Sequence, residues 1–113
     1  MIFEEERPWG KWEEYINERN YRVKRIIVHS GMRLSLQKHM LRSENWVIVQ
    51  GKGLFSLNGK SKELTAGDVV NIPVEGVHQV ENTGKEDFIF IETQLGECIE
   101  TDIVRIKDDW GRI

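Results

Sequence analysis

Hydrophobic and polar residues alternate along much of this chain, in short segments that end at glycine-containing or polar turns. The clearest alternation lies in Gly31–Gly51, where Met32, Leu34 and Leu36 are interleaved with a polar series of Arg33, Ser35, Gln37 and His39. Residues two apart on a strand project from the same face of a sheet. The alternation therefore predicts a strand over Met32–Lys38 with one polar face, which is typical of the wall of a lined cavity.

Further short segments predict many more strands. They are rich in β-branched and aromatic residues and are separated by polar or glycine-containing breaks. The predicted strands are Trp9–Ile16, Tyr21–His29, Glu44–Gln50, Leu54–Leu57, Ser61–Leu64, Val69–Ile72, Val77–Glu81, Phe88–Thr93 and Asp102–Ile106. Between two of them, Asn58-Gly59 is a pair preferred by the type I′ hairpin turn, whose two central residues both need positive φ. No helical period is sustained, so the pattern predicts an all-β sandwich or barrel.

Length and composition indicate a single domain. The chain has 113 residues, of which 39% are hydrophobic and 31% are charged, and these values are typical of one globular unit with one core. We expect one domain over residues 1–113, with residues 1–6 frayed or forming an early edge strand and with ordered structure beginning near Pro8.

Charge and cysteine content argue against several classes of function. The formal net charge is −3, so no global positive field would attract nucleic acid, and we expect the basic run Arg22–Arg25 to be a solvated strand face. No long hydrophobic run or signal-peptide segment occurs near Met1, so we expect a cytoplasmic protein with no membrane partner. Cys98 is the single cysteine and has no partner for an internal disulfide or a thiolate zinc site.

Two segments carry residue types that bind metal ions. The first holds Gln37, His39 and Glu44, and the second holds His78. Two imidazoles, a carboxylate and an amide oxygen suit one divalent ion (Zn, Mn, Co, Ni or Fe), with positions left for substrate or water. Because the amide oxygen of Gln37 is a weaker donor than imidazole, we expect a more electrophilic and less firmly held ion. The alternative is that both histidines are ordinary barrel residues and that Gln37 and Glu44 hydrogen-bond each other.

The spacing of these residues resembles the two cupin motifs. Every motif position is matched in spacing, through Gly31, Gln37, His39, Glu44 and Gly51 and then Gly67, Pro73, Gly76, His78 and Asn82. Gln37 replaces the first motif histidine. This Gln-x-His start and the flanking segments Arg7–Gly10, Tyr21–Ile26 and Asp102–Arg112 are similar to the C-terminal cupin domain of type II mannose-6-phosphate isomerases. The similarity extends from Arg7 to Arg112.

That resemblance implies a jelly-roll barrel, also called a double-stranded β-helix, and the interconversion of mannose 6-phosphate and fructose 6-phosphate. Such an isomerisation needs a Lewis acid, a base that moves a proton between neighbouring carbons, and cations that hold the phosphate. The family motif implies Arg42 as a catalytic residue and phosphate anchor, since guanidinium groups suit phosphate, and Glu44 is a candidate base. Arg33 and Arg105 are further phosphate-binding candidates, and Trp46 is a candidate for stacking on the sugar. Surface charge and core packing are the alternatives for these three.

Departures from the family keep other functions open. Asn45 stands where the family usually has a histidine, and an amide cannot accept and return a proton. The alternatives are a non-catalytic module that binds metal and sugar phosphate, and an iron-dependent cupin oxygenase. No glycine-rich nucleotide-binding loop precedes the cupin motifs, so we expect no guanylyltransferase activity. We also expect a homodimer, because the edge strands of small barrels need to be covered.

Overall fold

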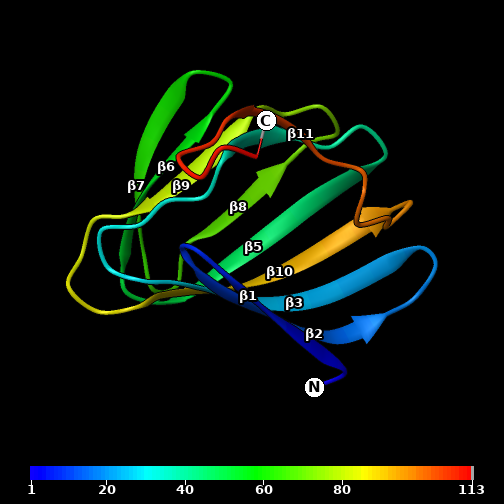
Figure 1. The fold of residues 1–113 in the computed structure, drawn as a ribbon, viewed down its shortest axis with the longest axis horizontal. Coiled ribbons are helices and arrows are strands. Elements are labelled where there is room, and N and C mark those ends of the chain that lie inside the picture. Colours follow the sequence, from blue (N-terminus) through cyan, green and yellow to red (C-terminus); the bar gives the residue numbers. More distant parts are fainter. Residues whose placement is uncertain (113) are drawn as a thin grey trace.

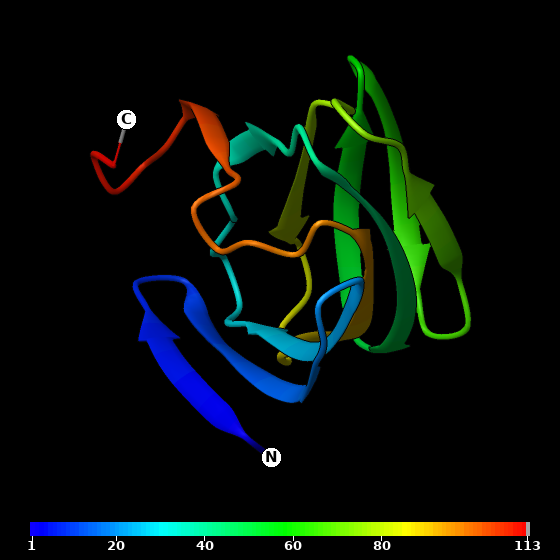
Figure 2. The same cartoon turned by 90° about the vertical axis from the view of Figure 1, so that its right-hand side faces the viewer.

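The computed structural model describes residues 1–112, which form two antiparallel β-sheets facing each other and include no helix (Figures 1 and 2). The strand order is β1-β2-β3-β10-β5-β8 in one sheet and β11-β4-β9-β6-β7 in the other. The strands are β1 (Phe3–Arg7), β2 (Gly10–Asn17), β3 (Tyr21–Val28), β4 (Leu36–Lys38), β5 (Arg42–Gln50), β6 (Lys52–Leu57), β7 (Lys60–Thr65), β8 (Val69–Ile72), β9 (His78–Asn82), β10 (Phe88–Gly96) and β11 (Val104–Lys107). The all-β prediction is confirmed.

Cross-strand register separates hydrophobic and polar side chains into rows on the inner face of the six-stranded sheet. One row, buried throughout, consists of Trp12, Ile26, Phe90 and Ile48. The next row on the same face is displaced by two residues on each strand and consists of Glu14, Lys24, Glu92 and Trp46. Side chains two apart share a face, so one end of the space between the sheets is hydrophobic and the other end is polar.

The hydrophobic end holds the core. Phe88 and Phe90 from the six-stranded sheet are fully buried and join Phe55, Leu64 and Val80 from the five-stranded sheet in one cluster. Burying each side chain of this size contributes roughly 1.5–3 kcal/mol. The core therefore stabilises the two sheets as a unit, and the polar end is left to carry the site.

Two predicted boundaries are corrected by the structure. Phe3–Arg7 forms edge strand β1, paired with β2 along its whole length, so ordered structure begins before Pro8 and the early-edge alternative describes this segment. The predicted strand Met32–Lys38 is shortened to Leu36–Lys38, with only an isolated bridge at Arg33 before it. Its neighbour Leu34 is hydrogen-bonded through its backbone to Val80 on β9, so the segment follows the sheet without regular strand geometry.

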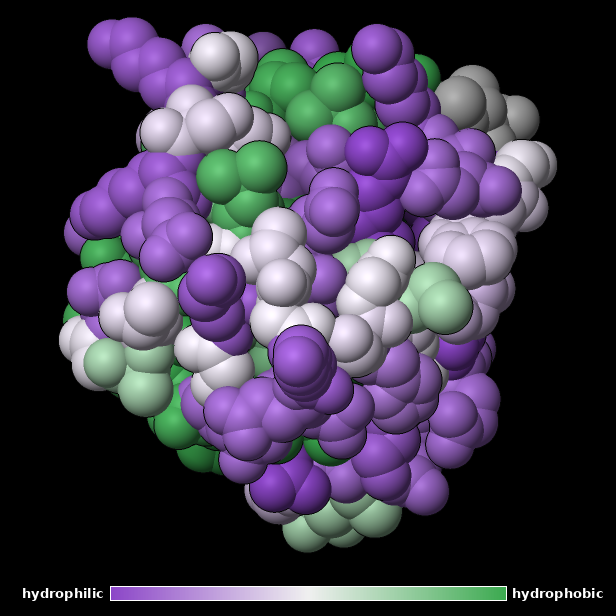
Figure 3. Space-filling view, turned by 90° about the vertical axis from the view of Figure 1, so that its left-hand side faces the viewer, coloured by the Kyte–Doolittle hydropathy of each residue, from purple (hydrophilic) through white to green (hydrophobic). Residues whose placement is uncertain are grey.

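The hairpin between β6 and β7 follows its turn residues. Asn58 and Gly59 have φ values of 50° and 83°, as a type I′ turn requires. β7 is an edge strand that exposes Lys60, Lys62 and Glu63, and the side of the molecule on which it lies is largely hydrophilic (Figure 3). Charges on an edge strand hinder pairing with another chain. None of the residues described belongs to a helix able to cross a membrane.

Candidate metal centre

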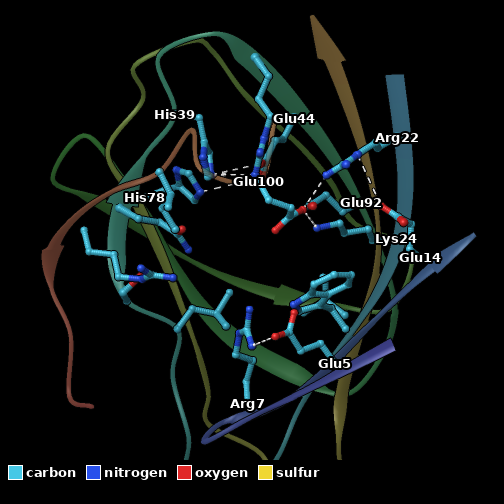
Figure 4. Close-up of a pocket in the computed structure, with 18 of the residues that line it drawn as sticks. Glu5, Arg7, Glu14, Arg22, Lys24, His39, Glu44, His78, Glu92 and Glu100 are labelled. Atoms are coloured by element: carbon cyan, nitrogen blue, oxygen red, sulfur yellow. Dashed lines mark hydrogen bonds and ion pairs between the residues drawn. The ribbon is translucent and has the colours of Figure 1, made fainter. Parts of the chain in front are cut away.

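Three of the four predicted ligands converge at the polar end of the barrel. His39 lies just after β4, Glu44 is on β5 and His78 is on β9. All three side chains are buried, and their potential ligand atoms lie within 4.8 Å of one another. Figure 4 shows the three pointing toward one another from different elements. The two sequence motifs therefore meet in space, as their spacing predicts.

Backbone carbonyls orient both imidazoles. Nδ1 of His39 is 2.6 Å from the Asp102 carbonyl, and Nδ1 of His78 is 2.9 Å from the Gly76 carbonyl. A carbonyl only accepts, so each Nδ1 carries the proton and each Nε2 offers a lone pair. Nε2 of His39 lies 3.1 Å from Glu44, and Nε2 of His78 lies 3.9 Å from Glu44.

The buried Nε2 of His78 has no hydrogen-bond partner among the described residues. An unpartnered buried acceptor is costly, and a divalent ion between the two imidazoles and Glu44 would satisfy it. Histidine ligands of metals characteristically donate their other ring nitrogen to a carbonyl or carboxylate, which is the arrangement of both residues. The donor set therefore fits a divalent ion.

Electrostatics keep both histidines in the form that binds metals. Burial lowers the pKa of His39 to about 4, with the cation of Arg42 acting in the same direction and the Asp102 carbonyl opposing it. Burial also lowers the pKa of His78, against the effect of the Gly76 carbonyl. Both imidazoles are neutral near pH 7, and neutral imidazole is the metal-binding form.

Gln37, the fourth predicted ligand, lies on a strand next to His78. On β4 it pairs directly with His78 of β9, and both residues line the same cavity. Directly paired residues on neighbouring strands have side chains within about 5.5 Å of each other. Gln37 therefore borders the cluster of His39, Glu44 and His78, and its amide stays a candidate for the fourth ligand.

Two neighbours hold the Glu44 carboxylate. Nε of Arg42 donates to one oxygen at 3.0 Å and Nε1 of Trp46 donates to the other at 3.0 Å. The Glu44 carboxylate is thus held in a fixed orientation between the two imidazoles. The terminal nitrogen Nη2 of Arg42 also lies 3.4 Å from Nε2 of His39, and Nη1 donates to the Ile99 carbonyl at 3.4 Å. Arg42 therefore contacts both Glu44 and His39.

Backbone contacts tie the surrounding loops to the centre. The Asp102 carboxylate accepts the backbone N–H groups of Met40 and Leu41, each at 2.9 Å, while its carbonyl orients His39. From the turn before β9, the N–H of Glu75 donates to the His39 carbonyl at 2.7 Å. His39 is therefore positioned by the loop before β11 and by the turn that leads to His78.

The metal centre lies in the wall of a cavity of about 440 Å³. Besides the ligands, the cavity is lined by charged side chains of the polar row, which lie opposite the metal centre and beside it (Figure 4). Lys24 is buried, pairs with Glu100 and has its ammonium 3.9 Å from the centroid of the Trp12 ring. Glu92 is buried next to it and accepts a hydrogen bond from Gln94 at 2.8 Å.

Glu92 has the most perturbed carboxyl group of the cavity. Burial raises its pKa to about 7, with the Glu44 carboxylate acting in the same direction and the cations of Lys24 and Arg42 opposing both. A carboxyl group of this kind exchanges protons near neutral pH, which is what a general acid or base needs.

The structure places three of the four predicted substrate-binding residues at the cavity. Arg105 and Arg42 line the cavity. Trp46 is at the cavity wall but is only 1% exposed and stacks on Phe90 at 4.1 Å, so it acts as a core residue and as the donor to Glu44. Arg33 is not brought to the cavity, since it is exposed and forms a two-pronged pair with Asp109 at 2.7 and 2.8 Å.

Arg33 is displaced because the predicted alternation breaks before β4. The adjacent residues Leu34 and Ser35 are both buried and both line the cavity, which regular strand geometry does not allow. The polar face of the predicted strand therefore begins after Arg33.

Sequence reasoning missed Lys24 and Glu92. Lys24 was expected on a solvated face, and this expectation is wrong: it is 4% exposed and lines the cavity. The available signal was the alternation of side chains along each strand. Lys24 is two residues from Ile26 and shares its face, and Glu92 likewise shares a face with Phe90 and Phe88. Polar residues in line with a core face are candidates for a cavity.

The facing antiparallel sheets and the buried His-Glu-His cluster at the polar end define a cupin domain. A solved structure agrees: an uncharacterized conserved protein of Klebsiella pneumoniae with a double-stranded β-helix domain matches at a TM-score of 0.75 and 21% identity, over 84% of this chain and 77% of that chain. Residues 2–108 match the family described as mannose-6-phosphate isomerase C-terminal, and the chain belongs to that family.

Curated relatives carry this domain within longer chains. The mannose-1-phosphate guanylyltransferase ManC of Salmonella typhimurium is 40% identical over 108 residues, which are 95% of this chain and 22% of that protein. The alginate biosynthesis protein AlgA of Pseudomonas aeruginosa is 38% identical over 107 residues, 94% of this chain and 22% of that protein. The chain therefore spans about a fifth of the length of these relatives.

Proposed function

We propose that this domain isomerises a sugar phosphate, with mannose 6-phosphate and fructose 6-phosphate as the substrate pair. The observation that carries the proposal is the convergence of His39, Glu44 and His78 in the cavity wall, in a chain of this family. Nε2 of His78 has no partner among the described residues. A divalent ion held by these residues and Gln37 would supply Lewis acidity to the carbonyl and hydroxyl oxygens of the sugar.

The proton transfer is assigned to Glu92. Aldose–ketose isomerisation removes a proton from one carbon and returns it to the neighbouring carbon, while the hydroxyl proton moves between the two oxygens. Both oxygens of the Glu44 carboxylate already accept hydrogen bonds, one from Arg42 and the other from Trp46, so Glu44 is poorly placed to take a proton from the substrate. Glu92 faces the same cavity, and among the described residues its carboxylate is hydrogen-bonded only by Gln94, which leaves one oxygen for the substrate.

The environment of Asn45 supports an enzyme over a binding module. Asn45 is on β5 next to Glu44, so it projects from the opposite face of the strand. Its amide donates to the side chain of Asn71 on β8 at 2.6 Å, on the outer face of the sheet. A histidine at this position would also face outward, so its replacement removes no base from the cavity.

A coupled assay tests the proposal. Fructose 6-phosphate formation from mannose 6-phosphate is followed with the chain loaded with manganese, cobalt or zinc. We expect turnover that His78→Ala abolishes and that His29→Ala leaves unchanged, because His29 is exposed and pairs with Asp87 at 3.0 Å outside the cavity. Glu92→Gln should lower kcat by about a hundredfold or more and leave the metal affinity near that of the wild type.

Two outcomes would count against isomerase activity. Binding of mannose 6-phosphate without turnover under every metal would favour the non-catalytic module. Turnover that survives His78→Ala would mean that the metal centre is not used.

A further inference from the structure

Among the described residues, Arg105 is the cavity arginine for which the structure shows no carboxylate partner. Its Nε is buried and has no hydrogen-bond partner, and within residues 1–112 no carboxylate lies within ion-pairing distance of it. The other arginines of this part of the cavity are paired: Arg7 with Glu5 at 2.7 Å, and Arg112 with Asp108 at 2.9 Å. Arg105 as a whole is half-buried, but a buried donor without an acceptor, such as its Nε, is costly, and an anion bound in the cavity would satisfy it.

Two other arginines lie near enough to Arg105 to affect its pKa. Burial lowers the pKa of Arg105, the cations of Arg112 and Arg7 act in the same direction, and Asp108 opposes them only in part. Arg7 comes from β1, on the opposite side of the cavity from His39 and Glu44 (Figure 4). The positive groups thus come from both ends of the chain and meet at one end of the cavity.

Strand register sets Arg105 at a fixed spacing from the metal centre. Arg105 on β11 pairs with Gln37 on β4, and Gln37 pairs with His78 on β9. All three residues line the cavity. Neighbouring strands are about 4.8 Å apart, so the backbones of Arg105 and His78 are about 10 Å apart. A small sugar phosphate can therefore contact Arg105 at one end and the ligand cluster at the other.

Arg42 is less suited to this task. Its Nε and one terminal nitrogen are directed at Glu44, and its other terminal nitrogen is directed at the Ile99 carbonyl. A phosphate on Arg42 would compete with the carboxylate that belongs to the metal centre. The Nε donor of Arg105 has no acceptor among the described residues, and Arg7 and Arg112, each paired with one carboxylate, lie near it.

We propose that Arg105, flanked by Arg7 and Arg112, forms the anion site of the cavity and binds the phosphate of a phosphate monoester whose other end reaches Gln37 and His78. The inference rests on the proposed function for the identity of the substrate class. Arginine suits this role because its planar fork matches phosphate oxygens.

Inorganic phosphate, titrated into the full chain freed of metal by a chelator, tests the site without any contribution from an ion. We expect Arg105→Gln to weaken phosphate binding by at least about tenfold, since hydrogen bonds between charged groups are strong. Arg33→Gln is the matched control: Arg33 is exposed and paired with Asp109 away from the cavity, so its loss should leave phosphate affinity unchanged. Arg7→Gln should weaken binding less than Arg105→Gln does.

Thermal unfolding of each variant separates lost binding from lost folding. Arg105→Gln removes a charge that has no partner among the described residues, so the melting temperature of this variant should not fall below that of the wild type. If the melting temperature does fall, the phosphate affinity of Arg7→Gln tests the same site independently. The proposal is overturned if phosphate does not bind the wild type, or if Arg105→Gln and Arg33→Gln bind it equally well.

The site and the isomerase activity fail separately. If the protein turns over mannose 6-phosphate but Arg105→Gln does not change the phosphate affinity, the isomerase proposal stands and the anion-site proposal is refuted. Phosphate binding that depends on Arg105, without turnover under any metal, would establish the anion site and refute the isomerase.

Discussion

The buried carboxyl group of Glu92 should make the metal-free protein less stable as pH rises toward neutrality. Burial raises its pKa from 4.5 to about 7, the nearby carboxylate of Glu44 adds to this rise, and Lys24, Arg42 and the Gln94 amide oppose it. Between these two pH values the folded protein holds a proton that the unfolded chain has released. The free energy of unfolding therefore falls as pH rises through this window, and the proton's stabilising effect is lost above about pH 7.

The expected size of the effect follows from the shift. A pKa rise from 4.5 to about 7 corresponds to a loss of about 3 kcal/mol across the window, as an order of magnitude. Glu92→Gln replaces the carboxyl group with a neutral amide of similar shape and removes this dependence. At about pH 8 we expect the metal-free variant to be the more stable protein, and near the acid end of the window the two should differ little.

Urea unfolding followed by tryptophan fluorescence, at several pH values between about 5 and 8, measures this difference.

Glu13→Gln is a control at a carboxyl group whose pKa is lowered by folding, whereas that of Glu92 is raised. The hydrogen bond from Arg25, at 2.6 Å, lowers the pKa of Glu13 to about 2 against the effect of burial. Its contribution to stability is fully present above pH 4.5 and is lost as pH falls through about 2. Glu13→Gln should thus be less stable than the wild type by a constant amount between about pH 5 and pH 8. Parallel wild-type and Glu92→Gln profiles would refute the reasoning.

Four further outcomes are expected. Gln37→His should tighten divalent-metal binding, measured by competition with a coloured chelator, because imidazole is a stronger donor than an amide; an unchanged affinity would show that this side chain does not reach the ion. Trp46→Phe should lower the free energy of unfolding by about 2 kcal/mol, since it removes the donor to Glu44 and packing on Phe90, whereas the same change at the exposed Trp110 should have little effect in urea unfolding. Asp102→Ala should lower the melting temperature and weaken metal binding, because it frees two backbone N–H groups of the loop after His39. Light scattering should give a homodimer, twice the chain mass of 13.3 kDa, and a monomeric mass would contradict this expectation.

Local patterns were sufficient to predict most strands and the three residues that converge at the candidate metal centre. The alternation of side chains defines which face each residue takes, so Glu44 and Trp46 could be assigned to one face of β5 before any pairing was known. The positive φ of Asn58 and Gly59 follows from their residue types alone. Gln37, His39, Glu44 and His78 could be named because two motifs of defined spacing contain them.

The opposite orientation of Asn45 was also within reach of the sequence. It follows Glu44 directly on a predicted strand, so parity alone places it on the other face. The structure adds its partner, Asn71 of β8, and with that partner the reason why an amide is tolerated there.

Strand pairing across long sequence separations decided the rest. Lys24 and Glu92 are neighbours because β3 pairs with β10 in one particular register, and Arg105 lies beside Gln37 because β11 pairs with β4. Alternation along a strand carries no information about which distant strand lies next to it, since that choice depends on how both sheets bury their hydrophobic rows together. The candidate ligands could therefore be named from local motifs, whereas the charges that surround them are brought together by the strand topology.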